Sequence, residues 1–341
     1  MRARVQYLEE RVQLLDKKSD EAQGGGGSGS SMTFSGLVEV EAASGKNREG
    51  VSSSDVVLST VELAAEAHLN AWTHAQVVYL FEEDATEPGE IDQAILTLGN
   101  AERSPIYLSA GRMYLPFGNF ESGMVSDPLT LELAEIRESA LQLGFDSAGF
   151  YGSLYAFNGD TAEAGEDDGI NHFGANLGFA GEHFDIGAGY LSTLADSDAN
   201  QELIEPFGAM QENVPGVAAH VIIERGPFTV IGEYVGANRD FASTDPAFPG
   251  EGARPSAWNL ELDYSFQMMG KEASLGVARQ RTSEAVALEL PKSKTLATFS
   301  VALFEATALS LEYAMAEDYS LSDGGSGESG GVFTVQLATE F

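Results

Sequence analysis

Acidic side chains recur at every second position in several apolar runs of this sequence, and they are its most abundant groups able to do chemistry. In the run VVLSTVELAAEAHL, Glu62 and Glu66 alternate with Val57, Val61 and Leu63. Because neighbouring side chains of a strand point to opposite faces, the acids would share a wet face and the aliphatic residues an apolar one. A wall of carboxylates in contact with water favours cations and repels anions.

The same alternation predicts the full set of residues on the wet faces, all of them carboxylic acids apart from one histidine. These residues are Glu39, Glu41, Glu62, Glu66, His74, Asp92, Glu224, Glu233, Glu261, Asp263 and Glu312. Almost no Lys or Arg falls on these faces to offset the negative charge. The alternative is that the acids only keep the surface hydrated, since screening over about 8 Å weakens their effect in a wide passage.

The whole chain is strongly acidic, with 53 Asp and Glu against 18 Lys and Arg in 341 residues and a formal net charge of -35. A nucleic-acid-binding protein needs the opposite sign, so nucleic acid is excluded as a partner. A solvated, salt-adapted surface is the alternative explanation of the charge.

Catalytic and metal-binding motifs are not recognisable in the sequence. The five histidines belong to no HExxH motif, and none has a serine and an acid at a telling spacing. The absence of cysteine excludes disulfides and a thiol nucleophile. Acidic segments at 82–90 and 165–169 offer clustered carboxylates for Ca²⁺, but neither matches an EF-hand loop, so solvated acid is the alternative. We therefore expect no enzyme, and no cofactor unless Ca²⁺ binds these loops.

One long segment at 112–137, RMYLPFGNFESGMVSDPLTLELAEIR, mixes acidic, basic and aromatic residues between two apolar runs. Opposite charges that face one another across a narrow passage create a transverse electric field and so set selectivity. An ordinary surface loop is the alternative. The residues that we predict to form such a constriction are Arg112, Tyr114, Glu121, Asp127, Glu132, Glu135 and Arg137.

The elements that must position these groups are strands. From Met32 to Phe341 the sequence shows about sixteen period-two runs, each roughly the 9–11 residues that a tilted membrane strand needs. Short connections alternate with long, acidic or glycine-rich ones. Since lipid satisfies no backbone hydrogen bonds, such strands must close into a barrel. We therefore predict an all-β fold, a transmembrane antiparallel up-and-down β-barrel at 32–341, and a soluble β protein is the alternative.

A coiled-coil helix is predicted ahead of the barrel at 1–23, followed by a flexible Gly/Ser linker at 24–31. Its apolar residues follow a heptad seam with flanking Arg and acidic side chains, which resembles a trimerisation motif of short coiled coils. Valine at a and leucine at d favour dimers instead, and two heptads are too short to associate unaided. A solvated amphipathic helix is a further alternative. The predicted oligomerisation residues are Arg4, Val5, Leu8, Glu9, Arg11, Val12, Leu15 and Asp16.

Two stretches carry a family resemblance. GRMYLPFGNFESGMVSDPLTLELAEIRESALQLGF, at 111–145, and FSGLVEVEA, at 34–42, resemble the LbtU-type siderophore porin family. The resemblance implies a barrel without an internal plug, preceded by a periplasmic coiled coil, and passage of a small polar iron chelator across the outer membrane. The terminal Phe341, on an alternating run, likewise resembles the recognition signal of bacterial outer-membrane barrels.

Together these features predict a bacterial outer-membrane porin through which small hydrophilic solutes diffuse, with cations preferred and the segment 112–137 narrowing the passage. Its expected partners are outer-membrane lipid, such solutes and further copies of itself, as a homotrimer locked by the coiled coil. The alternative is a structural tether, in which the periplasmic coiled coil binds the cell wall and the barrel is only an anchor.

Overall fold

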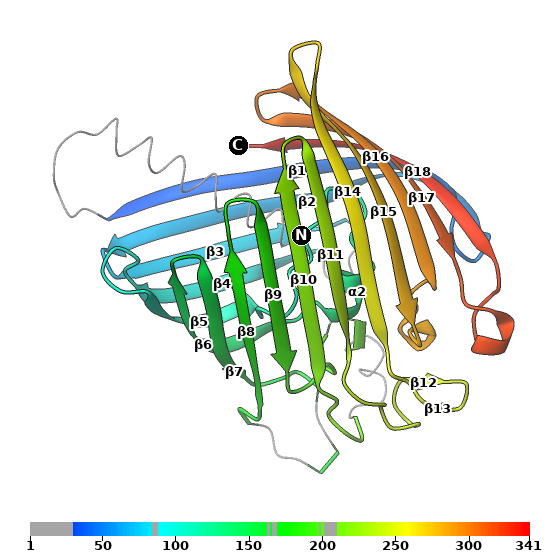
Figure 1. The fold of residues 1–341 in the computed structure, drawn as a ribbon, viewed down its shortest axis with the longest axis horizontal. Coiled ribbons are helices and arrows are strands. Elements are labelled where there is room, and N and C mark those ends of the chain that lie inside the picture. The colour runs from blue at the N-terminus through cyan, green and yellow to red at the C-terminus, as the bar shows by residue number, and fades with distance from the viewer. Residues whose placement is uncertain (1–29, 84–87, 162–163, 166–168, 198, 201–209) are drawn as a thin grey trace.

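The computed structural model describes residues 30–83, 88–161, 164–165, 169–197, 199–200 and 210–341. The predicted coiled coil and nearly all of the predicted linker lie outside these residues, and both stay predictions. Within the described part, almost every element is a β-strand (Figure 1).

Sixteen strands form one closed antiparallel barrel, in which each strand pairs with its neighbours along the chain and β18 closes on β1. The barrel strands are β1 (Ser31–Lys46), β2 (Ser52–Asn70), β3 (Thr73–Phe81), β4 (Gly89–Gly99), β5 (Ile106–Tyr114), β6 (Arg137–Ser147), β7 (Phe150–Phe157), β8 (His172–Ala180), β9 (Phe184–Leu191), β10 (Gly216–Arg225), β11 (Phe228–Ala237), β14 (Ser256–Met268), β15 (Lys271–Ser283), β16 (Ser293–Phe304), β17 (Thr307–Glu317) and β18 (Ser329–Glu340). The other described elements are the short strand pair β12 (Ala247–Phe248) and β13 (Glu251–Gly252), the helix α2 (Leu129–Ala134) and the 3-10 turns η1 (Val286–Leu288) and η2 (Leu321–Asp323). The predicted all-β barrel is confirmed.

The alternation in β14 shows why these residues form a barrel wall. Trp258, Leu260 and Leu262 are exposed on its outer face, whereas Asn259 and Glu261 are buried inside. Because the strands of a closed barrel satisfy one another's backbone N–H and C=O groups, this apolar outer face can meet hydrocarbon. At β14 the wall is therefore apolar outside and polar inside, as the period-two pattern predicts.

One register irregularity changes which residue of β2 faces outward. Glu39 of β1 pairs with Thr60, but Glu41 pairs with Val57, so β2 carries one extra residue between these pairs. Directly paired residues share a face of the sheet, and Val57 therefore points inward with Glu41, while Val56 is 67% exposed outside. The prediction that Val57 lies on the apolar face is wrong because a bulge shifts the two-residue period.

The two ends of the barrel differ in their connections. At one end, here called the short-turn end, strands turn in as few as two residues, as at 148–149 and 269–270, where both residues have positive φ. This is the conformation of tight hairpins. At the other end the connections include the long segments 192–215 and 238–255. Most connections follow the predicted alternation of short turns and long loops, but the first connection at the long-loop end, between β1 and β2, has only the five residues 47–51.

The apolar core of the molecule lies inside the barrel. The connection between β5 and β6, residues 115–136, enters the lumen and carries α2 (Figure 1), and we call it the inner loop. Its side chains Phe117, Phe120 and Leu133 are fully buried and cluster with residues of the wall strands β7, β9, β10 and β11. The inner loop therefore fills one part of the lumen and leaves another part for polar groups.

Candidate functional site: the lumen and its inner loop

A glutamate of the barrel wall holds the inner loop by its backbone. Glu233 of β11 accepts hydrogen bonds from the backbone N–H groups of Asn119 (2.6 Å) and Phe120 (3.1 Å) and from the hydroxyl of Thr130 (2.7 Å). Thr130 belongs to α2, so one carboxylate joins both halves of the inner loop to the wall. Three donors of the loop therefore converge on a single side chain of the wall.

Glu261 and Glu312 repeat this arrangement further along the loop. Glu261 of β14 accepts from the hydroxyl of Ser122 (2.8 Å) and from the backbone N–H of Gly123 (2.6 Å). Glu312 of β17 accepts from the backbone N–H (3.2 Å) and the hydroxyl (2.5 Å) of Ser126. The inner loop therefore follows the inner wall from β11 to β17.

Gly123 allows the loop to lie close to this wall. A Cβ atom at this position would lie 3.1 Å from a carboxylate oxygen of Asp263 and 3.2 Å from one of Glu261. A larger residue would therefore press on both acids. Asp263, predicted to line the pore, lies beneath the loop here.

The prediction that Glu233, Glu261 and Glu312 line the open pore needs a correction. They are on the inward face, as the alternation predicts, but they are only 6%, 1% and 1% exposed. The inner loop covers them, so they fasten the loop and do not meet a passing solute. Alternation shows which face of a strand a residue occupies, but it does not show what lies over that face.

Three residues predicted to belong to the constriction loop lie instead on the strands that flank it. These residues are Arg112, Tyr114 and Arg137. Arg112 and Tyr114 belong to β5, and Arg137 begins β6, because the β5–β6 pairing continues as far as Tyr114 and Arg137. Arg137 forms ion pairs with Glu90 (2.7 Å) and Asp92 (2.5 Å), and Tyr114 donates to Asp92 (2.8 Å). Arg112 lies 3.3 Å from Glu90. These charges are paired at the foot of the loop instead of facing one another across the passage.

The remaining predicted constriction residues are acids of the inner loop. Glu132 forms an ion pair with Lys294 of β16, an inward base that the sequence pattern did not indicate. Glu135 is buried, Glu121 is half-buried and Asp127 is exposed. Asp127 is therefore the predicted loop acid most open to water.

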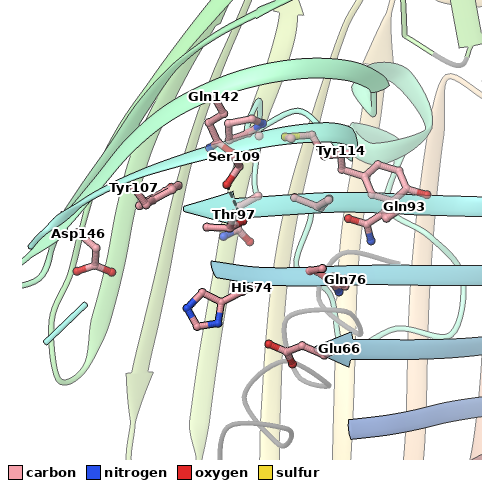
Figure 2. Close-up of a pocket in the computed structure, with 16 residues that line it drawn as sticks. Glu66, His74, Gln76, Gln93, Thr97, Tyr107, Ser109, Tyr114, Gln142 and Asp146 are labelled. Atoms are coloured by element: carbon pink, nitrogen blue, oxygen red, sulfur yellow. Dashed lines mark hydrogen bonds between the residues drawn. The ribbon is translucent and has the colours of Figure 1, made fainter. Parts of the chain in front are cut away.

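A cavity of about 760 Å³ lies between the first residues of the inner loop and the wall formed by β2 to β6 (Figure 2). This volume falls within the roughly 300–1,000 Å³ of ordinary ligand sites. No lysine or arginine is among its lining residues in the part of the chain that the structure describes. The lining residues labelled in Figure 2 are Glu66, His74, Gln76, Gln93, Thr97, Tyr107, Ser109, Tyr114, Gln142 and Asp146. Seven of these ten labelled residues carry an amide or a hydroxyl, so the cavity offers uncharged hydrogen-bonding groups.

Two histidines meet at the edge of this cavity. His74 of β3 is paired with His68 of β2, and their Nδ1 atoms are 2.7 Å apart. The Nε2 atom of His68 lies 3.2 Å from the carboxylate of Glu66. Even so, the described residues contain no group of three or more His, Cys, Asp or Glu side chains placed to hold a metal ion.

The other predicted pore-lining acids occupy the inner wall away from the cavity. Glu41 accepts a hydrogen bond from the amide of Gln336 (2.8 Å), and Glu224 is exposed near the β10–β11 turn. Glu39 and Glu62 are buried. The structure thus brings Glu66 and His74 of the predicted set to the cavity, and Asp92 to the foot of the inner loop.

The Ca²⁺ segments predicted at 82–90 and 165–169 fall partly outside the described residues, at 84–87 and 166–168. Ca²⁺ binding there stays a prediction. Helices in the described part of the chain are all too short or too polar to cross a membrane.

The barrel and its inward loop give the chain the fold of outer-membrane porins and channels. The outer membrane channel DcaP of Acinetobacter baumannii aligns with a TM-score of 0.65 at 12% identity, over 93% of this chain and 99% of that one. An anion-selective porin from Comamonas acidovorans gives 0.64 at 14% identity, over 92% and 100%. OmpT of Vibrio cholerae, in a trimer form, gives 0.55 at 10% identity, over 92% and 100%. At these identities the likeness concerns the fold alone.

Curated relatives of this chain are UPF0422 proteins. One from Legionella pneumophila is 32% identical over 295 residues, which are 79% of this chain and 55% of that protein. One from Coxiella burnetii is 27% identical over 294 residues, which are 83% of this chain and 63% of that protein. The chain thus spans about half the length of the Legionella relatives it matches. No protein-family model matches the chain, and the resemblance to the LbtU-type family stays a prediction.

Proposed function

We propose that this protein is a bacterial outer-membrane porin through which small hydrophilic solutes diffuse passively. The observation that carries the proposal is that the inner loop is fastened to the β11–β17 side of the lumen, while a polar cavity remains along β2–β6. A passage narrowed in this way selects solutes by size and by the groups that line it. The apolar outer face of the barrel and the likeness to outer-membrane porins support this location.

A preference for cations follows from how the charges of the lumen are compensated. The glutamates that hold the inner loop accept hydrogen bonds from backbone N–H groups and hydroxyls, none of which carries a positive charge. The inward bases Arg137 and Lys294, in contrast, are each paired with an acid. The lumen therefore carries excess negative charge, which attracts cations and repels anions. Screening over about 8 Å at physiological salt keeps the preference modest.

The same proposal covers the oligomeric state of the protein and the solute that it transports. We propose a homotrimer in outer-membrane lipid, supported by the trimer form of OmpT of Vibrio cholerae and by the predicted coiled coil, for which a periplasmic location is proposed. An iron chelator is one small hydrophilic solute that such a pore would pass, and we propose transport without catalysis. The tether alternative depends on residues 1–23, outside the described part of the chain, and we do not propose it.

Single-channel recording in a planar bilayer tests this function. Purified protein should give conductance steps in triplets, and a KCl gradient should give a reversal potential of the sign produced by K⁺ permeation. Replacing the exposed Asp127 by Asn should move that potential towards zero, whereas Asp55→Asn, in β2 at the end with the long loops, should change it less. The absence of conductance would refute the porin, and an anion-directed potential would refute the cation preference.

A further inference from the structure

The cavity beside the inner loop has a lining that fits one class of solute, and the inference deepens the proposed porin function on which it rests. We propose that this cavity binds neutral, polyhydroxylated solutes, which chemically means sugars and short oligosaccharides, on their way through the pore. The proposal stands on the charge of the lining, its hydrogen-bonding groups and one tyrosine ring.

The charge of the lining argues against an anionic solute. No lysine or arginine is among the described lining residues, and the two carboxylates, Glu66 and Asp146, lie near the ends of their strands at the short-turn end. Carboxylates and phosphates are held in proteins mainly by Arg and Lys. A solute with such groups would meet no basic side chain in this lining. An uncharged solute, in contrast, would not be repelled by the two carboxylates.

The middle of the lining offers amides and hydroxyls. Thr97 and Ser109, on adjacent strands, bond to each other through their hydroxyls at 2.8 Å. Gln142 donates from its amide nitrogen to the hydroxyl of Ser153 at 3.0 Å, and its side-chain carbonyl oxygen takes no part in that bond. Each of these groups can both accept and donate. Sugar hydroxyls do the same, so they can bond to any of them.

Gln93 is the strongest single indication of a ligand. Its side chain is only 5% exposed, and its Nε2 atom has no hydrogen-bond partner among the residues that the structure describes. A buried donor without a partner destabilises the protein, and such groups in native proteins call for an explanation. Figure 2 shows Gln93 at the cavity wall, beside Tyr114 and above Gln76. The Nε2 atom is itself shut off from solvent, and a turn of the side-chain amide towards the cavity would bring it to a hydroxyl of a bound solute.

Tyr107 supplies an aromatic surface. Its ring lies against the backbone of Gly144 on β6, where a Cβ atom would come within 2.1 Å of the ring. One face of the ring is therefore covered by glycine, and the residue lines the cavity. The face of an aromatic ring carries negative charge density, and it suits the weakly positive C–H groups on the flat side of a sugar.

The test uses the full-length protein with maltotriose, a neutral oligosaccharide. Calorimetry on detergent-solubilised protein measures binding, and single-channel recording in KCl measures interruptions of the current. We expect saturable binding and interruptions, and a loss of affinity of about tenfold for Gln93→Leu and for Tyr107→Leu. The matched control is Gln336→Leu, the same change on the inner wall outside the cavity, which should leave the affinity unchanged. Thr97→Val, nearly equal in size, replaces either variant that fails to fold.

The outcomes separate the inference from the porin function. A channel that conducts K⁺ but neither binds maltotriose nor is interrupted by it would overturn the inference and leave the porin standing. Binding that Gln93→Leu weakens, in a protein that does not conduct, would support the site and overturn the porin. Equal losses in Gln93→Leu and Gln336→Leu, or stronger interruption by the cationic peptide trilysine than by maltotriose, would also overturn the inference.

Discussion

Removing the carboxylate of Glu233 should release the inner loop from the wall. In the substitution Glu233→Ala, the backbone N–H groups of Asn119 and Phe120 and the hydroxyl of Thr130 lose their acceptor. Each unsatisfied buried donor costs roughly 1–3 kcal/mol, so three would cost about 3–9 kcal/mol if nothing moved. Water can reach the lumen and the loop can shift, and we therefore expect the lower end, about 3 kcal/mol.

Hydrogen exchange measures this loss directly. A local opening made easier by about 3 kcal/mol raises the population of the open state roughly a hundredfold. The amides of Asn119 and Phe120 should therefore exchange about a hundredfold faster in Glu233→Ala. Single-channel recordings of the same variant should show a noisier open state, since the loop borders the passage.

The matched control is Glu224→Ala, which removes an exposed inner-wall acid far from the loop. Like Glu233→Ala, it removes one carboxylate from the inner wall, but it should leave the hydrogen exchange of the Asn119 and Phe120 amides unchanged. Unaltered exchange in Glu233→Ala would refute the argument that this carboxylate holds the loop. Equal acceleration in both variants would show that charge, and not the hydrogen bonds, determines the loop's stability.

Two further predictions concern a buried ion pair and an outer loop. Arg137→Met leaves Asp92, 1% exposed, without its ion-pair partner, and it should lower the free energy of unfolding by about 3 kcal/mol in guanidinium titrations. Arg137→Lys should restore part of this loss. Equal stability of the Met and Lys variants would contradict the argument. Desolvation acts to raise the pKa of Asp318, but hydrogen bonds from the backbone N–H and hydroxyl of Ser326 (both 2.7 Å) bring it below its ordinary value. A carboxyl group whose pKa is lower in the folded protein than in the unfolded chain stabilises the folded state at pH values above the unfolded-state pKa. This stabilisation is lost as the pH falls through the folded-state pKa. A spin label at Ser322→Cys should therefore become more mobile below about pH 4, and Ser326→Ala should show that mobility already at neutral pH; a label insensitive to both changes would exclude this role.

The barrel could be predicted from the sequence because its signal is local. Each strand needs only the alternation of its own side chains, and in β14 the exposed Trp258 and Leu260 against the buried Glu261 give that signal directly. The alternation misplaces Val57 because a bulge adds a residue to β2, and a bulge leaves no mark in the composition of the strand.

The site was harder to predict because its contacts are not local. The sequence places Glu233 on the inward face, but the groups that cover it come from a segment more than a hundred residues earlier, with Asn119 separated from it by 114 positions. Likewise, the pairing of Lys294 with Glu132 depends on the position that α2 takes inside the barrel. A signal does exist in the stretch GNFESGMVS at 118–126, where small residues leave backbone N–H groups accessible to an acceptor.

The sequence distance between the inner loop and its anchors has a consequence for the order of folding. The loop leaves the barrel after β5, yet its fastening groups come from β11, β14 and β17, as far as 187 residues away along the chain. Contacts of such separation form late, because the chain must first close long loops. The inner loop can thus dock fully only after β17 has joined the barrel, and its docking reports that the wall is nearly complete. A chain truncated before β17 would lack the last acceptor and would leave this segment free in the nascent pore.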